Sequence, residues 1–303
     1  MYYTNEQLAQ IVHYKNSGFS SRDIAQAVGI SKSGVNTALK RLYSSGPRVL
    51  MFDLENAPSL ACAFQRFNVN LTPSHIVQEG GWLISASWKW LGKETTQGVV
   101  LTPDEALEQN DSRIVQTMID QFEQADFVVA HNGKRFDVPL LRARVLKNGL
   151  RPMKTVRCID TLVIAKSMKF ESNKLDSLCN YLDIGRKLET TGIGLWMKCM
   201  NGDRQALAKM LEYNKKDVDL LEELYLELRP FDRTGPNYGQ YYNDGLLHCP
   251  ACGSTNLSQT GNLVYTNVSQ YPELVCDDCG HRSRERGSTN SKEQRANLLM
   301  RAG

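Results

Sequence analysis

The sequence predicts an α/β fold in which a mixed sheet is flanked by helices, with a small all-α domain before it and a small cysteine-rich module after it. Apolar strand-like runs alternate with amphipathic helical segments in the middle of the chain, and helical periodicity alone marks its start. Two close pairs of cysteines mark its end. Hydrophobic residues make up 41% of the 303 positions, which is ordinary for a chain with a sizeable core. The predicted segments are 1–46, 47–234, 244–287 and a polar tail at 288–303, either disordered or a short helix.

The formal net charge of +3 is too small to identify a partner, but its distribution is uneven. Residues 1–46 alone carry a net charge of +3, whereas the middle of the chain is close to neutral. No apolar run reaches the ~18 residues that a membrane span needs. The first residues also lack the charged-then-apolar pattern of a signal peptide. The sequence therefore predicts a cytoplasmic protein without a membrane partner.

Residues 5–43 predict three short helices joined by tight turns. Ala25 is a small residue where two helices would cross, Gly29 permits a left-handed turn between them, and Val35 fills their shared core. The segment resembles helix-turn-helix DNA-binding domains. The resemblance implies that the third helix enters the major groove of duplex DNA. Its candidate DNA contacts are Lys32, Ser33, Asn36, Lys40 and Arg41. A three-helix module for protein contact is the alternative, and the basic excess favours DNA.

The central segment predicts strands first and then alternating strands and helices, which is the pattern of a mixed sheet with flanking helices. Trp82, Trp88 and Trp90 alternate along one strand, and core packing is preferred over a stacking platform for bases. Strands are expected at 48–56, 80–92, 97–102 and 126–133. Helices are expected at 102–125, 137–149, 173–184 and 203–228.

Acidic residues stand at three separated places in this segment. Asp53 and Glu55 alternate on a strand, so both carboxylates point to one face, where burial is costly unless a cation offsets their repulsion. Asp137 lies where a loop meets the next helix, a usual place for functional groups in α/β folds. Tyr213 and Asp217 are four residues apart and share one face of a late helix. Taken singly, each of these patterns is also typical of solvent-exposed acids.

Together, the motifs D-x-E, N-x-x-x-F-D and Y-x-x-x-D occur in an order that resembles the DEDDy branch of the DEDD 3′–5′ exonucleases, whose domain has an RNase-H-like fold. The resemblance covers residues 47–230. The other branch has His where this sequence has Glu212, so it is disfavoured. The resemblance implies a metal-dependent 3′–5′ exonuclease that hydrolyses DNA phosphodiester bonds and releases nucleoside 5′-monophosphates.

The same resemblance implies a two-metal-ion mechanism in which Mg²⁺ or Mn²⁺ ions are bound by Asp53, Glu55, Asp137 and Asp217. Such a pair of ions holds the attacking and leaving oxygens of an in-line displacement, and carboxylates suit these hard cations. Tyr213 would orient the attacking water.

Four neighbouring residues have more than one interpretation. Asn132 fixes its loop or contacts substrate, and Phe136 packs in the core or supports a base or sugar. His131 is preferred as a loop or capping residue over a catalytic base. Asp160 is preferred as a helix cap over a residue that supports the acidic site.

The cysteine pairs form two C-x-x-C motifs with 23 residues between them, and each is followed by a glycine. Four thiolates suit one tetrahedral Zn²⁺ with no open position, so the segment resembles a zinc ribbon with a structural ion. The ligands would be Cys249, Cys252, Cys276 and Cys279. Arg282, Arg284 and Arg286 would form a basic rim that favours nucleic acid, although a protein partner stays open.

Two other functions fit parts of the sequence. A transposase-like RNase-H-fold nuclease would also combine these modules, but such enzymes usually lack Y-x-x-x-D on the last helix. A sequence-specific DNA-binding regulator with an inactive nuclease core is the non-enzymatic alternative, and the complete set of acids argues against it. The helix-turn-helix favours DNA because the deep major groove of A-form RNA excludes such a helix. RNA stays open as a further substrate.

Overall fold

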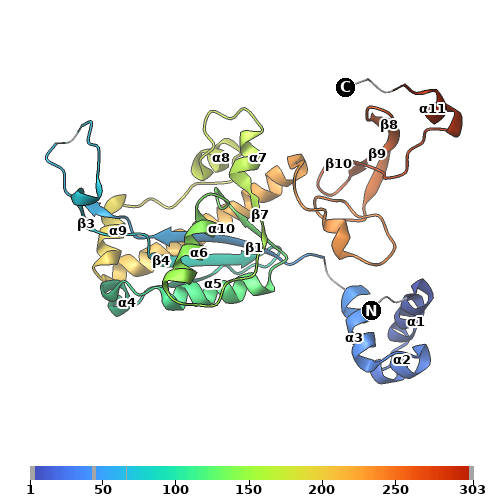
Figure 1. Cartoon of the computed structure of the whole chain (residues 1–303), viewed down its shortest axis with the longest axis horizontal. Coiled ribbons are helices and arrows are strands. Elements are labelled where there is room, and N and C mark those ends of the chain that lie inside the picture. The colour runs from blue at the N-terminus through green and yellow to red at the C-terminus, as the bar shows by residue number, and fades with distance from the viewer. Residues whose placement is uncertain (1–3, 43–45, 66, 300–303) are drawn as a thin grey trace. The chain divides into compact units, whose positions relative to one another are not determined.

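A computed structural model of the chain describes residues 4–42, 46–65 and 67–299. It forms two compact units, of which one is Arg48–Leu228 and the other combines Met1–Pro47 with Arg229–Gly303 (Figure 1). Within these described ranges, none of the helices combines the length and the apolar composition that crossing a bilayer requires.

The larger unit contains a five-stranded mixed sheet with the strand order β5-β4-β1-β6-β7. Its strands are β1 (Val49–Asn56), β4 (Leu83–Trp90), β5 (Gln97–Val100), β6 (Phe127–Ala130) and β7 (Arg157–Asp160). β1 pairs antiparallel with β4, and β4 pairs antiparallel with β5. β1 and β7 each pair in parallel with β6. This mixed sheet confirms the predicted architecture, although β7 lies where no strand is expected.

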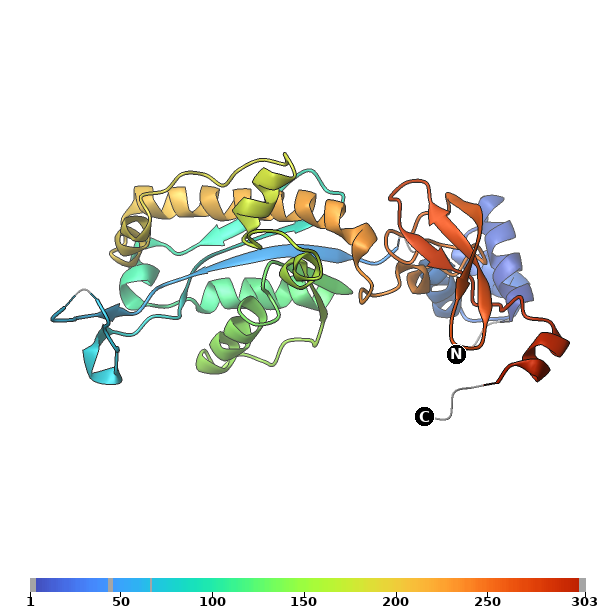
Figure 2. The same cartoon turned by 90° about the horizontal axis from the view of Figure 1, so that it is seen from above.

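Helices cover both faces of the sheet, with α10 (Arg204–Leu228) and α5 (Ser112–Gln124) on opposite sides (Figure 2). α10 packs against β4, β1 and β5, while α5 packs against β4 and against α6. The other helices of this unit are α4 (Pro103–Glu108), α6 (Asp137–Lys147), α7 (Thr161–Lys166), α8 (Leu175–Tyr181) and α9 (Ile193–Met200). α7 follows Asp160, which the sequence marks as a helix cap, whereas α9 lies in a stretch where the sequence predicts no helix.

The prediction of one continuous helix over 102–125 is wrong. Thr102 opens α4 with a capping box, and the helix ends at Gln109, whose left-handed φ of 56° stops the helical ladder. A new helix, α5, begins after Asp111. The apolar periodicity continues through the break, and this is why the pattern indicates a single helix.

Alternate residues of β1 face opposite sides of the sheet. Leu50, Phe52 and Leu54 are buried in the main core, where the Phe52 ring lies edge-on to Phe122 of α5 with centroids 5.0 Å apart. The intervening acidic residues therefore face α10.

The tryptophan stripe of β4 belongs to the core, as predicted. Trp82 and Trp88 are buried in the core cluster, and Trp90 packs against that cluster while remaining partly exposed. The Arg48 guanidinium lies 4.5 Å above the ring of Trp90.

An excursion leaves the sheet between β1 and β4. It contains β2 (Leu60–Ala61), a 3₁₀ turn (Pro73–His75) and β3 (Ile76–Gln78). At its base, the amide of Ala57 donates to the carbonyl of Trp82 at 2.8 Å. Phe64 and Phe67 lie in this excursion with 108% and 81% of their surface exposed, so its tip contributes nothing to the core.

The chain begins with three helices, α1 (Asn5–Asn16), α2 (Ser21–Val28) and α3 (Lys32–Leu42). Gly29 ends α2 with a left-handed φ of 71°, and the Ser31 hydroxyl accepts the amide of Gly34 at 2.9 Å at the start of α3. Val35 is fully buried and Ala25 packs beside it, as the helix-turn-helix pattern predicts. The buried core of these helices consists of Ile11, Ile24, Val28, Val35 and Ala38.

The C-terminal part contains a three-stranded antiparallel sheet with the order β10-β9-β8. The strands are β8 (Leu257–Tyr265), β9 (Gln270–Cys276) and β10 (Arg282–Arg284). Two 3₁₀ turns, Arg229–Phe231 and Tyr238–Tyr241, precede them. Of the two alternatives for the tail, the structure shows the short helix, α11 (Lys292–Asn297).

Asp111 joins three elements of the larger unit and gives a test of its packing. Its carboxylate is fully buried and accepts from the Leu83 amide at 2.8 Å, from Arg144 Nε at 2.7 Å and from Asn148 Nδ2 at 2.8 Å. We expect Asp111→Ala to lower the free energy of unfolding by about 3–5 kcal/mol, because the guanidinium and the amides lose their buried acceptor. Urea unfolding followed by tryptophan fluorescence measures this change.

Asp120→Ala provides the matched control, because Asp120 is an exposed aspartate on the neighbouring α5. Its unfolding free energy should stay within about 0.5 kcal/mol of the wild-type value. Equal stabilities for the two variants would contradict the structural role of Asp111.

Candidate active site and metal-binding groups

Three of the predicted acids meet between β1 and α10. Asp53 pairs with Ser87 and Glu55 pairs with Ser85 across the β1–β4 ladder, so both carboxylates stand on the face that α10 covers. Asp217 comes from α10 and is buried. Carboxylate oxygens of Asp53, Glu55 and Asp217 all lie within 4.8 Å of one another. The sequence spacing therefore produces a compact acidic group from residues that are far apart in the chain.

Small residues of the sheet allow α10 to approach this closely. Ser85 and Ser87 are fully buried under the helix, and Gly98 of β5 lies beside them. A Cβ atom at Gly98 would stand 2.6 Å from the Ser87 hydroxyl and 2.8 Å from a methyl group of Leu211. A larger side chain at this position would have to displace the Ser87 hydroxyl and the Leu211 methyl group, both of which lie between the sheet and α10.

Asp137 opens α6 next to the same group. It is 3% exposed, and its carboxylate accepts a hydrogen bond from the backbone of Leu54, the residue between the two acids of β1. Its negative charge is the strongest charge contribution to the raised pKa of Asp53. Asp137 lies outside the group defined by the 4.8 Å limit, but it acts electrostatically on Asp53 and Glu55.

The loop before Asp137 is fixed by Asp160, the last residue of β7. The buried Asp160 carboxylate accepts the amides of Asn132 at 2.9 Å and Lys134 at 3.1 Å, and it also caps α7 through Leu162 at 3.0 Å. Asp160 therefore caps a helix, as preferred from the sequence, and also anchors the loop that leads to Asp137. Asn132 adopts a left-handed φ of 67° in this loop.

The acids raise each other's pKa. Burial raises the pKa of Asp53 well above its usual value, and the neighbouring carboxylates add to this shift. Burial and the charge of Asp217 raise the pKa of Glu55 to about 8, while burial raises the pKa of Asp137 to about 7. Burial also raises the pKa of Asp217, although Lys187 opposes that shift. Ionised carboxylates this close together repel one another, so the group favours the binding of either protons or a cation.

Lys187 is a member of the site that the sequence analysis missed. Its ammonium lies 2.5 Å from Asp217 Oδ2 and donates to the Tyr213 hydroxyl at 3.1 Å. Burial disfavours the charged ammonium, but the charge of Asp217, its hydrogen bond to Lys187 and the nearby Tyr213 and Asp53 together outweigh burial and raise the pKa of Lys187. Lys187 stands in an irregular segment between α8 and α9, where the sequence offers no periodic signal.

Tyr213 turns its hydroxyl toward the acids. It hydrogen-bonds to Asp217 and to Lys187, and burial together with the charge of Asp217 raises its pKa to about 12. The phenol therefore stays protonated at neutral pH and serves as a hydrogen-bond donor. The ring lies edge-on to Trp196 of α9, with centroids 6.0 Å apart, and the Trp196 side chain also hydrogen-bonds to Glu55.

Asn214 is a second residue that the sequence analysis missed. Its amide donates to Asp53 Oδ2 at 2.7 Å and accepts from the Ser85 hydroxyl at 3.2 Å, and its side chain is fully buried. Asn214 lies one helical turn after Met210 and one before Asp217 on the buried stripe of α10. That helical periodicity was a usable signal for a buried polar group facing the acids.

The acidic group fits a hard divalent cation. Asp217 Oδ1 is buried and has no hydrogen-bond partner among the described residues, so this oxygen is available as a ligand. Asp53 and Glu55 keep part of their surface open to solvent, which leaves a route for a cation and a substrate. The donor atoms are carboxylate oxygens, which Mg²⁺ and Mn²⁺ prefer.

The structure favours one of the two sequence interpretations for each of the loop residues His131 and Phe136. His131 Nδ1 lies 2.9 Å from the hydroxyl of Thr161, the first residue of α7, and Nε2 lies 2.9 Å from the Asn173 carbonyl before α8. Both ring nitrogens therefore tie the loop to neighbouring segments. Burial lowers the pKa of His131. Phe136 is 46% exposed, so core packing is the wrong alternative for it and nucleotide contact remains a prediction.

The predicted DNA contacts of α3 divide into two groups. Lys32, Ser33 and Asn36 are exposed on the helix. The side chains of Lys40 and Arg41 lie outside the described residues.

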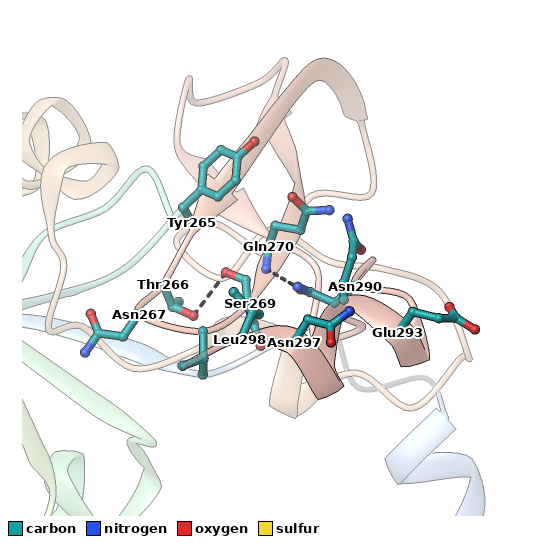
Figure 3. A pocket seen from close by; sticks show the side chains of 11 residues that line it. Tyr265, Thr266, Asn267, Ser269, Gln270, Asn290, Glu293, Asn297 and Leu298 are labelled. Atoms are coloured by element: carbon teal, nitrogen blue, oxygen red, sulfur yellow. Dashed lines mark hydrogen bonds between the residues drawn. The ribbon is translucent and has the colours of Figure 1, made fainter. Parts of the chain in front are cut away.

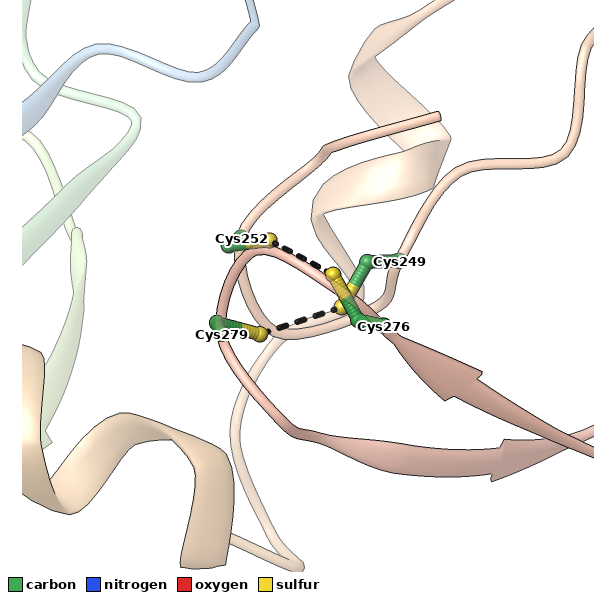
Figure 4. Close-up of side chains that lie close together, drawn as sticks. All are labelled: Cys249, Cys252, Cys276 and Cys279. Atoms are coloured by element: carbon green, nitrogen blue, oxygen red, sulfur yellow. Dashed lines mark hydrogen bonds between the residues drawn. The ribbon is translucent and has the colours of Figure 1, made fainter. Parts of the chain in front are cut away.

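The four paired cysteines come together at one end of the C-terminal sheet (Figure 4). Cys249 and Cys279 have sulfurs 3.7 Å apart, and the sulfurs of Cys252 and Cys276 are 3.6 Å apart. A tetrahedral zinc with Zn–S bonds of about 2.3 Å requires sulfurs roughly 3.8 Å apart, so this group can hold such an ion.

The glycines after each cysteine pair adopt the left-handed turn that the motif requires. Gly253 has a φ of 81° and Gly280 a φ of 75°, and their amides donate to the carbonyls of Cys249 and Cys276. The residues of the predicted basic rim follow the second cysteine pair in the sequence, and all three are exposed: Arg282, Arg284 and Arg286.

The acidic group makes metal-free stability depend on pH. Raised pKa values mean that the folded state binds more protons than the unfolded chain between the ordinary carboxylate pKa of about 4 and the folded values of about 7 for Asp137 and about 8 for Glu55. The free energy of unfolding should therefore fall as pH rises through this window. We expect the melting temperature of protein dialysed free of Mg²⁺ and Mn²⁺ to decrease from about pH 5 to about pH 8.

Added Mn²⁺ should restore that melting temperature most strongly at the upper end of the window, where the carboxylates are ionised. The double variant Asp53→Asn/Glu55→Gln should show a flatter pH profile and a smaller response to Mn²⁺. A wild-type profile that is flat without metal, or an equal Mn²⁺ response in the double variant, would contradict the electrostatic account. Differential scanning calorimetry provides the measurement.

Comparisons with known proteins agree with this architecture. Residues 82–229 match a family model described as the RNase_H superfamily, and residues 14–46 match one described as winged helix-turn-helix DNA-binding. The chain is similar to a solved structure of the family B DNA polymerase from Pyrobaculum calidifontis, with a TM-score of 0.44 and 15% identity over 61% of this chain and 25% of that chain.

Two curated relatives are PolC-type DNA polymerase III chains. The one from Ureaplasma parvum is 25% identical over 44% of this chain and 9% of its own length. The one from Mycoplasma pneumoniae is 30% identical over 47% of this chain and 11% of its own length. This chain thus spans about a tenth of these relatives. Together with the sheet topology, the matches identify an RNase H-like domain in the larger unit and a helix-turn-helix region at the start of the chain.

Proposed function

We propose that this protein is a metal-dependent 3′–5′ exonuclease that hydrolyses DNA phosphodiester bonds and releases nucleoside 5′-monophosphates. One observation carries the proposal: carboxylate oxygens of Asp53, Glu55 and Asp217 lie within 4.8 Å of one another, beside the Tyr213 hydroxyl that Lys187 contacts at 3.1 Å. Burying three acids together without catalytic use would only cost stability. An RNase H-like domain related in part to PolC-type DNA polymerase III chains supports the same class of reaction.

Two Mg²⁺ or Mn²⁺ ions would be held by Asp53, Glu55, Asp137 and Asp217. When bound, such ions lower the pKa of a coordinated water and neutralise charge on the scissile phosphate. The charges of Asp137, Glu55 and Asp217 all act on Asp53, which suits Asp53 to be a ligand shared by the ions. Asp137 accepts a hydrogen bond from the backbone of Leu54, and it would contribute from the α6 side.

The chain's own groups then position the reactants. The Tyr213 hydroxyl accepts from Lys187 and donates its one proton to Asp217. With substrate bound, it would turn this hydrogen bond to the attacking water and orient that water toward the terminal phosphate. Asn214 fixes the rotamer of Asp53 through its amide, and Trp196 does the same for Glu55. The water adds to phosphorus, the bond to the 3′ oxygen of the preceding nucleotide breaks, and that oxygen leaves with a proton.

The flanking modules would hold the nucleic acid. Duplex DNA would contact α3 through Lys32, Ser33 and Asn36, together with Lys40 and Arg41. The cysteine group would bind one structural Zn²⁺ and form a zinc ribbon. Its exposed arginines at 282, 284 and 286 would contact phosphates, since guanidinium groups pair well with them.

Amide substitutions of the acids test the proposal. We expect Asp217→Asn to lower the rate of nucleotide release at least about a thousandfold, because the ligand charge is lost, and Tyr213→Phe to lower it about a hundredfold. Purified protein is incubated with 5′-labelled and with 3′-labelled DNA and RNA, with and without Mn²⁺, and the products are sized. Ladders that shorten from the 3′ end, with mononucleotides as the released product, are the expected result.

Asp183→Asn serves as the matched control, because Asp183 is an exposed aspartate whose left-handed φ of 56° asparagine also tolerates. It should retain wild-type activity. Nicks at defined internal sequences would instead favour the transposase-like alternative. Complete absence of hydrolysis by wild type with Mn²⁺ would favour a DNA-binding regulator.

The cysteine group makes a separate prediction. Wild-type protein should carry one zinc per chain, and Cys276→Ser should lose it, because three thiolates complete the tetrahedral shell poorly. Elemental analysis measures zinc content, and trypsin cleavage after the arginines of β10 reports loss of the folded sheet. Cys62→Ser alters an exposed cysteine outside the group and should change neither readout. Zinc retained by Cys276→Ser would overturn the assignment.

A further inference from the structure

A pocket of about 540 Å³ lies between the β8–β9 turn and α11 (Figure 3). This volume falls within the range of small-molecule sites. The pocket belongs to the C-terminal part of the chain and contains none of the acids or cysteines described above. It is lined by Tyr265, Thr266, Asn267, Val268, Ser269, Gln270, Asn290, Glu293, Gln294, Asn297 and Leu298.

Specific hydrogen bonds hold the walls of this pocket together. The segment before α11 pairs with the start of β9, since the amide of Thr289 donates to the Gln270 carbonyl at 3.0 Å and the Asn290 side chain accepts the Gln270 amide at 2.8 Å. The opposite wall is a tight turn in which the Thr266 hydroxyl and amide both donate to the Ser269 carbonyl. The tail is therefore docked against the sheet.

The lining has the chemistry of a base-binding site. None of the lining side chains is basic, so the pocket offers nothing to neutralise a phosphate. The side-chain amides of Gln270 and Asn297 make no hydrogen bond to other residues in the described part of the chain, and each offers both donors and acceptors. Tyr265, 70% exposed at the pocket, supplies an aromatic face for stacking.

A basic path leads to the pocket along the same segment. Arg284 of β10 stacks over the ring of Tyr271 at 3.9 Å, and Tyr271 follows Gln270 in β9. From Arg284 the chain runs along the edge of β9, where the Glu285 amide donates to the Pro272 carbonyl at 3.1 Å, and it then reaches the pocket wall. Arg286 is exposed on this path. If Arg284 and Arg286 bound the backbone phosphates of a nucleic-acid strand, a base of that strand would lie at the pocket.

We propose that this pocket binds an unpaired nucleobase of a single strand, read by the amides of Gln270 and Asn297 and stacked on Tyr265. A paired base has its Watson–Crick edge occupied, so the pocket discriminates single strands from duplexes. The proposal rests on the nucleic-acid role proposed for the C-terminal sheet, but it requires no hydrolysis.

The test compares two strands that have equal phosphate charge. One is a single-stranded oligonucleotide, and the other has the same length and the same 3′-terminal nucleotides but abasic residues elsewhere. Full-length Asp53→Asn protein, used without added Mg²⁺ or Mn²⁺ to prevent degradation, should bind the base-bearing strand about tenfold more tightly by fluorescence anisotropy. Adding Gln270→Ala and Asn297→Ala should bring this ratio close to one.

Two further variants separate base recognition from phosphate binding. Adding Arg284→Ala and Arg286→Ala should weaken the binding of both strands in parallel and leave their ratio unchanged. Adding Gln259→Ala, which alters an exposed glutamine of β8 outside the pocket, should change neither affinity nor ratio. Equal affinity of the Asp53→Asn protein for the two strands would overturn the pocket assignment, as would an unchanged ratio in the Gln270→Ala/Asn297→Ala protein. Exonuclease activity of the wild type would stand in either case.

Discussion

Repulsion among carboxylates is the constraint on which the larger unit depends. β1 places Asp53 and Glu55 under α10, and that helix returns Asp217 to the same place. The fold tolerates this concentration of charge because Lys187 pairs with Asp217 and Asn214 donates to Asp53. Ser85, Ser87 and Gly98 keep β4 and β5 small where α10 crosses them, so the helix comes close enough for its polar side chains to reach the acids of β1.

The general architecture could be predicted from the sequence, whereas several local elements could not. Apolar runs identified β1, β4, β5 and β6, because buried strands and long amphipathic helices have strong periodic signals. β7 is only Arg157–Asp160, and a strand this short has too few residues to show a period. The break between α4 and α5 depends on one left-handed residue, Gln109, which composition does not mark. At Gln109 the left-handed backbone ends the helix although the apolar periodicity continues.

The candidate active site was also predictable only in part, because some of its residues lie outside regular strands and helices. The acids and Tyr213 stand at fixed spacings within strands and helices, so their common faces follow from geometry. Lys187 lies in an irregular segment whose path depends on the packing of α8 and α9, and no spacing rule brings it to Asp217. Trp196 reaches Glu55 from a helix that the sequence did not reveal. Asn214 differs, since it follows Tyr213 on the buried stripe of α10 and could have been recognised.

The ammonium of Lys187 has a consequence for how the acidic group responds to its ionic surroundings. It lies on one oxygen of Asp217 while the other oxygen has no partner among the described residues. A divalent ion that approaches Asp217 would therefore compete with the Lys187 ammonium, a monovalent cation that the protein itself holds next to this carboxylate. Lys187 offsets one negative charge of the group, and a cation bound at Asp217 would share this carboxylate with the ammonium. Without a bound metal ion, Lys187 thus serves as the counter-ion of Asp217.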